Sequence, residues 1–171
     1  MSGDRKLLEL GCRHPVYIRF HSISRENPTN ERRVSPCLRK APYKTRLSGS
    51  CRLRQRACLL KEFLDLHRNP DGTLTFDGVF AHTDYHGYMF KKILQEEGYR
   101  VPDDVQIIGF DGITKFGNEG DELFVSSICQ PVKHIAEKCV EILTSQTDSI
   151  APSVTLLPVD YRCGGTTKDA V

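Results

Sequence analysis

The sequence predicts an α/β fold with a parallel β-sheet built from strand–helix–strand units. The strongest observation is the stretch 101–112, which reads VPDDVQIIGFDG. Pro102 lacks an amide donor and disfavours helix at the residue before it, so we expect a turn there. The nearly continuous apolar run over 105–110 is typical of a strand buried on both faces of a parallel sheet. Asp111 follows at the carboxyl end of this strand, where open α/β sheets bind ligands.

The chain before this strand alternates between helix and strand signals, which favours a parallel sheet. We expect helices over about 7–10, 59–66 and 84–97, and strands over 16–20 and 79–81. Gly11 and Gly98 stand where the first and the last of these helices should end. Asp84 is expected to cap the last helix at its start, and residues 69–72 (Asn-Pro-Asp-Gly) are expected to form a turn.

The chain after residue 111 contains one further strand–helix–strand unit. A strand is expected over 125–129, and Pro131 then opens a helix over 131–146. The last strand is expected over 154–161. The apolar residues of the 131–146 helix share one face: Val132, Ile135, Ala136, Cys139, Val140 and Leu143.

Length and composition are those of an ordinary globular domain. The chain has 171 residues, of which 39% are hydrophobic and 27% are charged. The N-terminus lacks the apolar core of a signal peptide, and no apolar run has membrane-spanning length. We therefore expect a cytoplasmic protein that does not interact with a membrane. The seven cysteines form no CxxC pair, which favours reduced thiols over disulfides or zinc.

Polar side chains follow three of the expected strands: Thr83 and Asp84, then Asp111, then Gln130. In a parallel sheet with right-handed crossovers, the carboxyl ends of successive strands converge on one rim. Carboxylates and amides supply the paired donors and acceptors that sugar hydroxyls need, so we expect a ligand site at this rim. Structural interpretations also exist: a helix cap for Asp84, a loop-ordering carboxylate for Asp111 and a connector residue for Gln130.

Metal and enzyme chemistry have weaker support. His82, Asp84 and His86 could hold a metal ion, but the two histidines belong to different expected elements, and no metal site is expected. The segment 70–74, PDGTL, resembles the phosphate-transfer loop of haloacid-dehalogenase-type phosphatases, but Asn69 stands where that chemistry needs a nucleophilic Asp. The sequence contains no GxSxG elbow, P-loop or GxGxxG motif, so neither an enzyme nor a cofactor is expected.

Three stretches carry a family resemblance: GVFAHTDYHGYMFKKILQEEGYRVPDDVQIIGFD (78–111), SSICQPVKHIAEKCVEIL (126–143) and LLPVDYRCGGTT (156–167). In this order and spacing they resemble the sensor domain of LacI/GalR-type transcriptional repressors, which shares the fold of periplasmic sugar-binding proteins. The opening LLELGCRHPVYIRF (7–20) fits the same pattern more loosely. The resemblance covers most of 7–32 and 59–167, and among sugar repressors it is greatest for the sucrose-operon type.

The resemblance implies an incomplete sensor domain of the periplasmic binding protein type I over 1–167, followed by a tail over 168–171. Its ligand would be a sugar or sugar phosphate effector, bound at positions that match the family's effector contacts: Thr83, Asp84, Asp111, Gln130, Arg32 and Arg25. Full-length members are homodimers that bind operator DNA through a helix-turn-helix headpiece. We expect this headpiece and the first sensor subdomain to be absent from this chain, so the apolar face of the 131–146 helix would lack its cover. A stand-alone carbohydrate-binding module is the alternative function.

Residues 32–58 differ sharply from the rest of the chain. They contain nine Lys and Arg and no Asp or Glu, whereas the remainder contains 15 basic and 22 acidic residues. Because such clusters neutralise phosphates, a nucleic-acid-binding patch is one interpretation. We favour out-of-frame translation over about 33–58, because the Gly-aromatic pair that the family places after Arg32 is missing. Under either interpretation, this segment is expected to be loop-like or poorly ordered.

Overall fold

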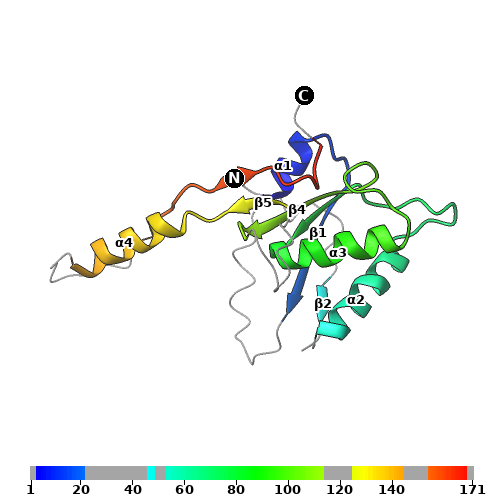
Figure 1. Ribbon diagram of the computed structural model, residues 1–171, viewed down its shortest axis with the longest axis horizontal. Coiled ribbons are helices and arrows are strands. Elements are labelled where there is room, and N and C mark those ends of the chain that lie inside the picture. The colour runs from blue at the N-terminus through cyan, green and yellow to red at the C-terminus, as the bar shows by residue number, and fades with distance from the viewer. Residues whose placement is uncertain (1–2, 22–45, 49–52, 114–124, 145–153, 169–171) are drawn as a thin grey trace.

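The computed structural model describes residues 3–21, 46–48, 53–113, 125–144 and 154–168. In this part of the chain the helices and strands follow one another as shown in Figure 1: α1 (Gly3–Glu9), β1 (Pro15–His21), β2 (Arg46–Ser48), α2 (Leu53–Leu66), β3 (Gly78–Ala81), α3 (Asp84–Glu96), β4 (Gln106–Asp111), β5 (Ser126–Cys129), α4 (Val132–Thr144) and β6 (Asp160–Arg162). None of the helices among these residues is long and apolar enough to cross a membrane.

The strands of the described residues form one six-stranded sheet in the order β2-β1-β3-β4-β5-β6. The strands from β2 to β5 pair in parallel, and β6 pairs antiparallel to β5. The predicted α/β fold with a parallel sheet is therefore confirmed, with the edge strand β6 as the exception.

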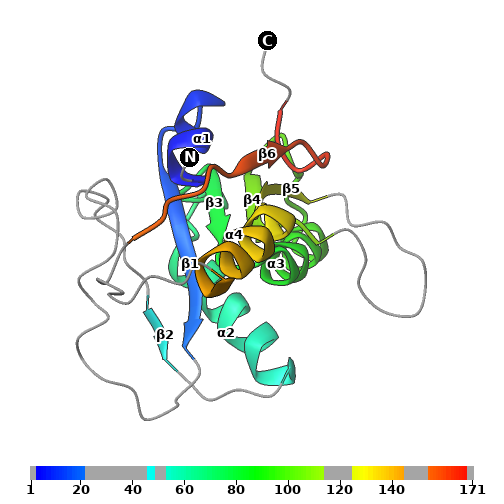
Figure 2. The ribbon, with the colours of Figure 1, turned by 90° about the vertical axis from the view of Figure 1, so that its left-hand side faces the viewer.

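Different helices cover the two faces of the sheet (Figure 2). On one face, α2 and α3 enclose the larger buried cluster, which includes Val79, Phe90 and Ile107. On the other face, α1 contributes Leu7 to a smaller cluster that includes Ile108. Successive residues of a strand point to opposite faces, and both Ile107 and Ile108 are fully buried. This confirms the prediction that the strand within 101–112 is buried on both faces.

The last strand is shorter than predicted. The expected span was 154–161, but β6 covers only Asp160–Arg162, and the described residues 154–159 have no regular secondary structure. Pro158 has no amide to donate to a strand ladder. Val154 and Leu156 are exposed, so no packing surface holds this segment in extended form. The alternation of apolar residues over 154–159 therefore does not produce a strand.

Part of the basic segment is folded, contrary to the expectation of a loop. β2 pairs with β1 at the edge of the sheet, and α2 begins at Leu53, before the predicted helix start at Leu59. Leu60, Phe63 and Leu64 hold this helix to the larger cluster. The helix extends beyond these apolar residues toward the N-terminus. The rest of 33–58 lies outside the described residues. That this segment arises from out-of-frame translation stays a prediction.

The fourth helix, α4, extends away from the sheet instead of packing on it (Figure 1). It contains no buried residue. Its apolar side chains are exposed, with Val132 at 67% and Leu143 at 84% of their full accessible area. The prediction of a helix whose apolar face has no cover therefore agrees with the structure over Val132–Thr144.

Candidate ligand-binding site

Thr83 lies at the transition from β3 to α3. Its φ of −142° and ψ of 158° are extended, and its Oγ1 accepts a hydrogen bond from the His86 amide at 3.3 Å. The same oxygen lies 2.8 Å from Nδ1 of His86. Thr83 therefore caps α3, and the prediction that Asp84 does so was wrong. Threonine and aspartate can both cap a helix, and here Asp84 is already the first helical residue.

Asp84 turns its carboxylate toward the chain that leaves β4. Its Oδ2 accepts a hydrogen bond from the Ile113 amide at 2.6 Å. The residue is fully buried, and its Oδ1 has no hydrogen-bond partner among the described residues. Burial raises the pKa of Asp84 above its usual value, while hydrogen bonding and the nearby Arg162 guanidinium oppose this shift. Asp84 thus orders the turn that follows β4.

Asp111 and Gln130 meet at the ends of two neighbouring strands. Nε2 of Gln130 donates a hydrogen bond to Oδ1 of Asp111 at 3.0 Å. Asp111 is the last residue of β4, and Gln130 directly follows β5. Both residues are half-buried, so each keeps part of its surface open to solvent. The expected convergence of strand ends is present at this pair.

The turn formed by Gly112 and Ile113 has all four of its backbone polar groups bonded to side chains. The Gly112 amide donates to Oγ of Ser127 at 3.1 Å, and the Ile113 amide donates to Asp84. The Gly112 carbonyl accepts from Nη1 of Arg162 at 3.0 Å, and the Ile113 carbonyl accepts from Nη2 of the same residue at 3.1 Å. Side chains from α3, β5 and β6 therefore hold one turn.

Ser127 and Arg162 were not among the predicted site residues. Strand register places them in one row with Gly109, since Gly109 pairs with Ser127 and Ser127 pairs with Arg162. This row could not be derived from the chain order, because β6 is antiparallel. A hydroxyl inside a buried strand was the available signal for Ser127. Arg162 had none, because the predicted last strand ended at residue 161, whereas β6 ends at Arg162.

The two histidines near this rim have partners other than a metal ion. Nδ1 of His82 lies 3.2 Å from the Tyr17 hydroxyl, and Nδ1 of His86 lies beside Thr83 Oγ1. Within the described ranges, no group of three His, Cys, Asp or Glu side chains could hold a metal ion. Arg25 and Arg32, the other two predicted contacts, lie outside the described residues.

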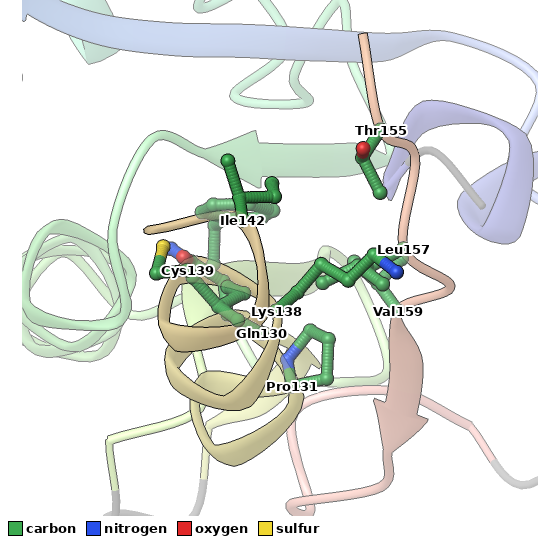
Figure 3. Close-up of a pocket in the computed structure, with 10 residues that line it drawn as sticks. Gln130, Pro131, Lys138, Cys139, Ile142, Thr155, Leu157 and Val159 are labelled. Atoms are coloured by element: carbon green, nitrogen blue, oxygen red, sulfur yellow. The ribbon is translucent and has the colours of Figure 1, made fainter. Parts of the chain in front are cut away.

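A cavity of about 340 Å³ opens beside Gln130, between α4 and the segment that leads into β6 (Figure 3). It is lined mainly by apolar side chains: Phe110, Pro131, Ile135, Cys139, Ile142, Leu157 and Val159, with Gln130, Lys138 and Thr155. Of the predicted site residues within the described ranges, Gln130 alone lines it. The cavity and the polar rim are therefore adjacent but separate features.

The parallel sheet, with polar side chains gathered at the carboxyl ends of β3, β4 and β5, defines an α/β domain of the ligand-binding class. The chain belongs to the periplasmic binding protein-like domain family, whose model matches residues 5–167. The predicted fold family is thereby confirmed.

Two curated relatives of the chain are transcriptional regulators. The chain is 29% identical over 157 residues to the sucrose operon repressor of Streptococcus mutans serotype c, which covers 90% of this chain and 46% of that protein. It is also 32% identical over 87 residues to the HTH-type transcriptional regulator CelR of Thermobifida fusca, covering 51% of this chain and 23% of the relative. The predicted resemblance to LacI/GalR-type repressors is confirmed, and the chain spans about half or less of the length of these relatives.

Solved structures share the fold. A LacI family transcriptional regulator from Arthrobacter sp. FB24 superposes with a TM-score of 0.68 at 20% identity, over 96% of this chain and 61% of that chain. A second structure of that regulator is a complex with lactose. The structure titled transcriptional regulator CelR-cellobiose complex gives a TM-score of 0.62 at 22% identity, over 95% of this chain and 49% of that chain.

Proposed function

We propose that this chain is the effector-binding part of a LacI-type, sugar-responsive transcriptional regulator. The proposed effector is a sugar or a sugar phosphate. The proposed contacts are Thr83, Asp84, Asp111 and Gln130 at the strand-end rim, together with Arg25 and Arg32. The observation that carries the proposal is the Asp111–Gln130 hydrogen bond of 3.0 Å, formed between half-buried side chains at adjacent strand ends.

This pair has the chemistry that a sugar hydroxyl requires. A carboxylate accepts several hydrogen bonds, and a carboxamide both donates and accepts, so together they can bind one hydroxyl as donor and acceptor. The existing bond between Asp111 and Gln130 holds both groups in place before a ligand arrives. Asp84 is fully buried, unlike Thr83, Asp111 and Gln130, and its contribution is to hold the backbone beside Asp111.

The proposal extends to the whole regulator. In that protein, the sensor would act in a homodimer and the operator would be bound through a helix-turn-helix headpiece, in the cytoplasm. The support is that the named relatives are transcriptional regulators and that two structural neighbours are complexes with cellobiose or lactose. A catalytic role is not proposed, because those relatives are regulators.

Calorimetry on the purified chain tests the binding proposal. The saccharide panel is sucrose, cellobiose, lactose and their phosphorylated forms. We expect one member to bind, and Gln130→Ala and Asp111→Gly to weaken it by about 0.5–1.5 kcal/mol each, or about 2- to 13-fold. Glycine is chosen at Asp111 because the φ there is positive, at 112°.

Gln95→Ala is the matched control, because Gln95 is an exposed glutamine on α3 away from the rim. It should leave the affinity unchanged. The proposal fails if no saccharide of the panel binds. It also fails if both rim variants bind the sugar with the same affinity as the control variant.

A further inference from the structure

The turn at Gly112 and Ile113 follows a residue in an unfavourable backbone conformation. Asp111 has a φ of 112°, and within the described ranges it is the only non-glycine residue with a positive φ. A residue with a Cβ is disfavoured in this region, so such a conformation persists only where the surroundings hold it. The direction of the Asp111 carboxylate therefore depends on contacts that the next two residues make.

Arg162 makes the two contacts that fix both carbonyls of this turn. Its Nη1 lies 3.0 Å from the Gly112 oxygen and its Nη2 lies 3.1 Å from the Ile113 oxygen. A guanidinium presents its donors in a rigid planar fork, so one side chain can hold two successive carbonyls at once. A lysine ammonium at the same place is a point donor and holds them less well.

Arg162 reaches the turn from the strand that pairs with β5, while Asp84 reaches it from the start of α3. The buried Asp84 carboxylate accepts a hydrogen bond from the Ile113 amide. The Arg162 guanidinium donates to the carbonyls of the same turn, so the turn is held by groups of opposite charge. The Ser127 hydroxyl accepts from the Gly112 amide and completes the set. Of the three, Arg162 alone comes from β6, the antiparallel edge strand of the sheet.

We infer that Arg162 is a positioning residue of the ligand site: its guanidinium holds the Gly112–Ile113 turn and thereby fixes the Asp111 carboxylate beside Gln130. For its ligand, this inference rests on the function proposed above. Arg162 does not touch the sugar in this scheme and acts only through Asp111. Because β6 comes after α4 in the chain, the same contacts also tie the rim to the segment that returns from α4.

Nuclear magnetic resonance on the isotope-labelled full chain tests the inference without any sugar. The amide–Hα coupling and carbon shifts of Asp111 report its positive φ, and the exchange rate of the Ile113 amide reports its hydrogen bond to Asp84. In Arg162→Leu, we expect the positive-φ signature to be lost and Ile113 exchange to accelerate about tenfold. Arg162→Lys should restore part of both signals. Arg100→Leu, which removes an exposed arginine bonded to Asp104, should change neither.

Sugar affinity supplies the second readout. Arg162→Leu should lower the affinity for the saccharide that binds as much as Asp111→Gly does. The double variant should bind that saccharide no more weakly than either single variant. Additive losses would instead show that Arg162 acts independently of Asp111. If no saccharide binds the wild type, the proposed function fails, while the Asp111 and Ile113 signals still decide whether Arg162 positions the turn.

Unchanged Asp111 and Ile113 signals in a folded Arg162→Leu chain would overturn the inference. If that variant does not fold, Arg162→Lys and Ser127→Ala decide the question. Ser127→Ala removes the acceptor of the Gly112 amide and should shift the Asp111 signature in the same direction as Arg162→Lys. Folded variants that both retain the wild-type Asp111 signature would overturn it equally.

Discussion

Gly109 leaves the space that the Asp84 carboxylate occupies. A Cβ built on Gly109 would lie 2.8 Å from the Asp84 Cα and would overlap Oδ1 of the same residue. The missing side chain therefore lets the first turn of α3 lie directly on β4. This close approach brings Asp84 within hydrogen-bond distance of the Ile113 amide, two residues beyond the end of the strand.

A methyl group at position 109 should therefore be costly. We expect Gly109→Ala to lower the free energy of unfolding by about 1–3 kcal/mol, because the extra carbon meets backbone as well as side-chain atoms. Urea unfolding measures this loss. In an Asp84→Ala background the same substitution should cost less, since the overlap with Oδ1 is gone. A Gly109→Ala chain as stable as the wild type would show that α3 is not held against β4 in this way.

Because the pKa of Asp84 is raised, its burial makes the free energy of unfolding depend on pH. Burial raises the folded-state pKa above the reference value of 3.8, so below that value the carboxyl is protonated in both states and imposes no penalty. As the pH rises from 3.8 toward the folded-state pKa, the unfolded chain loses its proton first and stability falls. Above the folded-state pKa the penalty stays constant.

Asp84→Asn removes this penalty and keeps an acceptor for the Ile113 amide. The stability of the wild type relative to Asp84→Asn should therefore decrease as the pH rises from 3.8. Urea unfolding of both chains over an acidic to neutral pH series measures the difference. A difference that increases with pH would mean that the hydrogen bonds to Asp84 and the Arg162 guanidinium together outweigh desolvation, so that its pKa is lowered.

The cysteines should differ widely in reactivity. Cys12 is buried, and burial raises its pKa to about 12, whereas Cys58, Cys139 and Cys163 are exposed. Alkylation at neutral pH, followed by mass spectrometry of the peptides, should label the three exposed thiols first. Cys12 should react only when the chain is unfolded by urea. Labelling of Cys12 in the folded chain at the rate of Cys58 would contradict its burial between α1 and the sheet.

The exposed apolar face of α4 should make the chain self-associate, because contiguous apolar surface favours association. Sedimentation velocity should show a mass that rises with concentration. Val132→Lys combined with Leu143→Glu should lower this association, since both side chains are largely exposed on α4. Leu66→Glu, on the exposed end of α2, is the control and should have little effect. A monodisperse wild-type monomer at all concentrations would contradict the prediction.

The sequence predicted β1, β3, β4 and β5 because each of these strands carries its own local signal. The run over 105–110 is apolar and short, and Gly98 ends the preceding helix with a φ of 88°. The edges of the sheet were harder to predict. β2 is formed by three residues of an Arg-rich segment, and its pairing depends on the free edge of β1 rather than on its own composition.

The site was predictable at the level of strand ends and not at the level of contacts. The carboxyl ends of β4 and β5 had to meet in a parallel sheet, so the proximity of Asp111 and Gln130 followed from the fold. Whether Thr83 or Asp84 caps α3 depends on which of them is the first helical residue. Both residue types can cap a helix, so the sequence does not reveal which one does. Arg162 required the antiparallel register of β6, which no local pattern specifies.

A chemical-shift map of saccharide binding shows directly whether the strand-end rim binds a sugar. Amide resonances of the labelled chain would be followed during titration with sucrose, cellobiose, lactose and their phosphorylated forms. We expect saturable shifts at Thr83, at Asp111 through Ile113, and at Gln130. The surface turn at 69–72 should change little, because its Gly72 carbonyl accepts from Tyr99 beyond the C-terminal end of α3, whereas Thr83 lies at the N-terminal end. Saturable shifts confined to residues outside this rim, or no shift with any sugar, would contradict it.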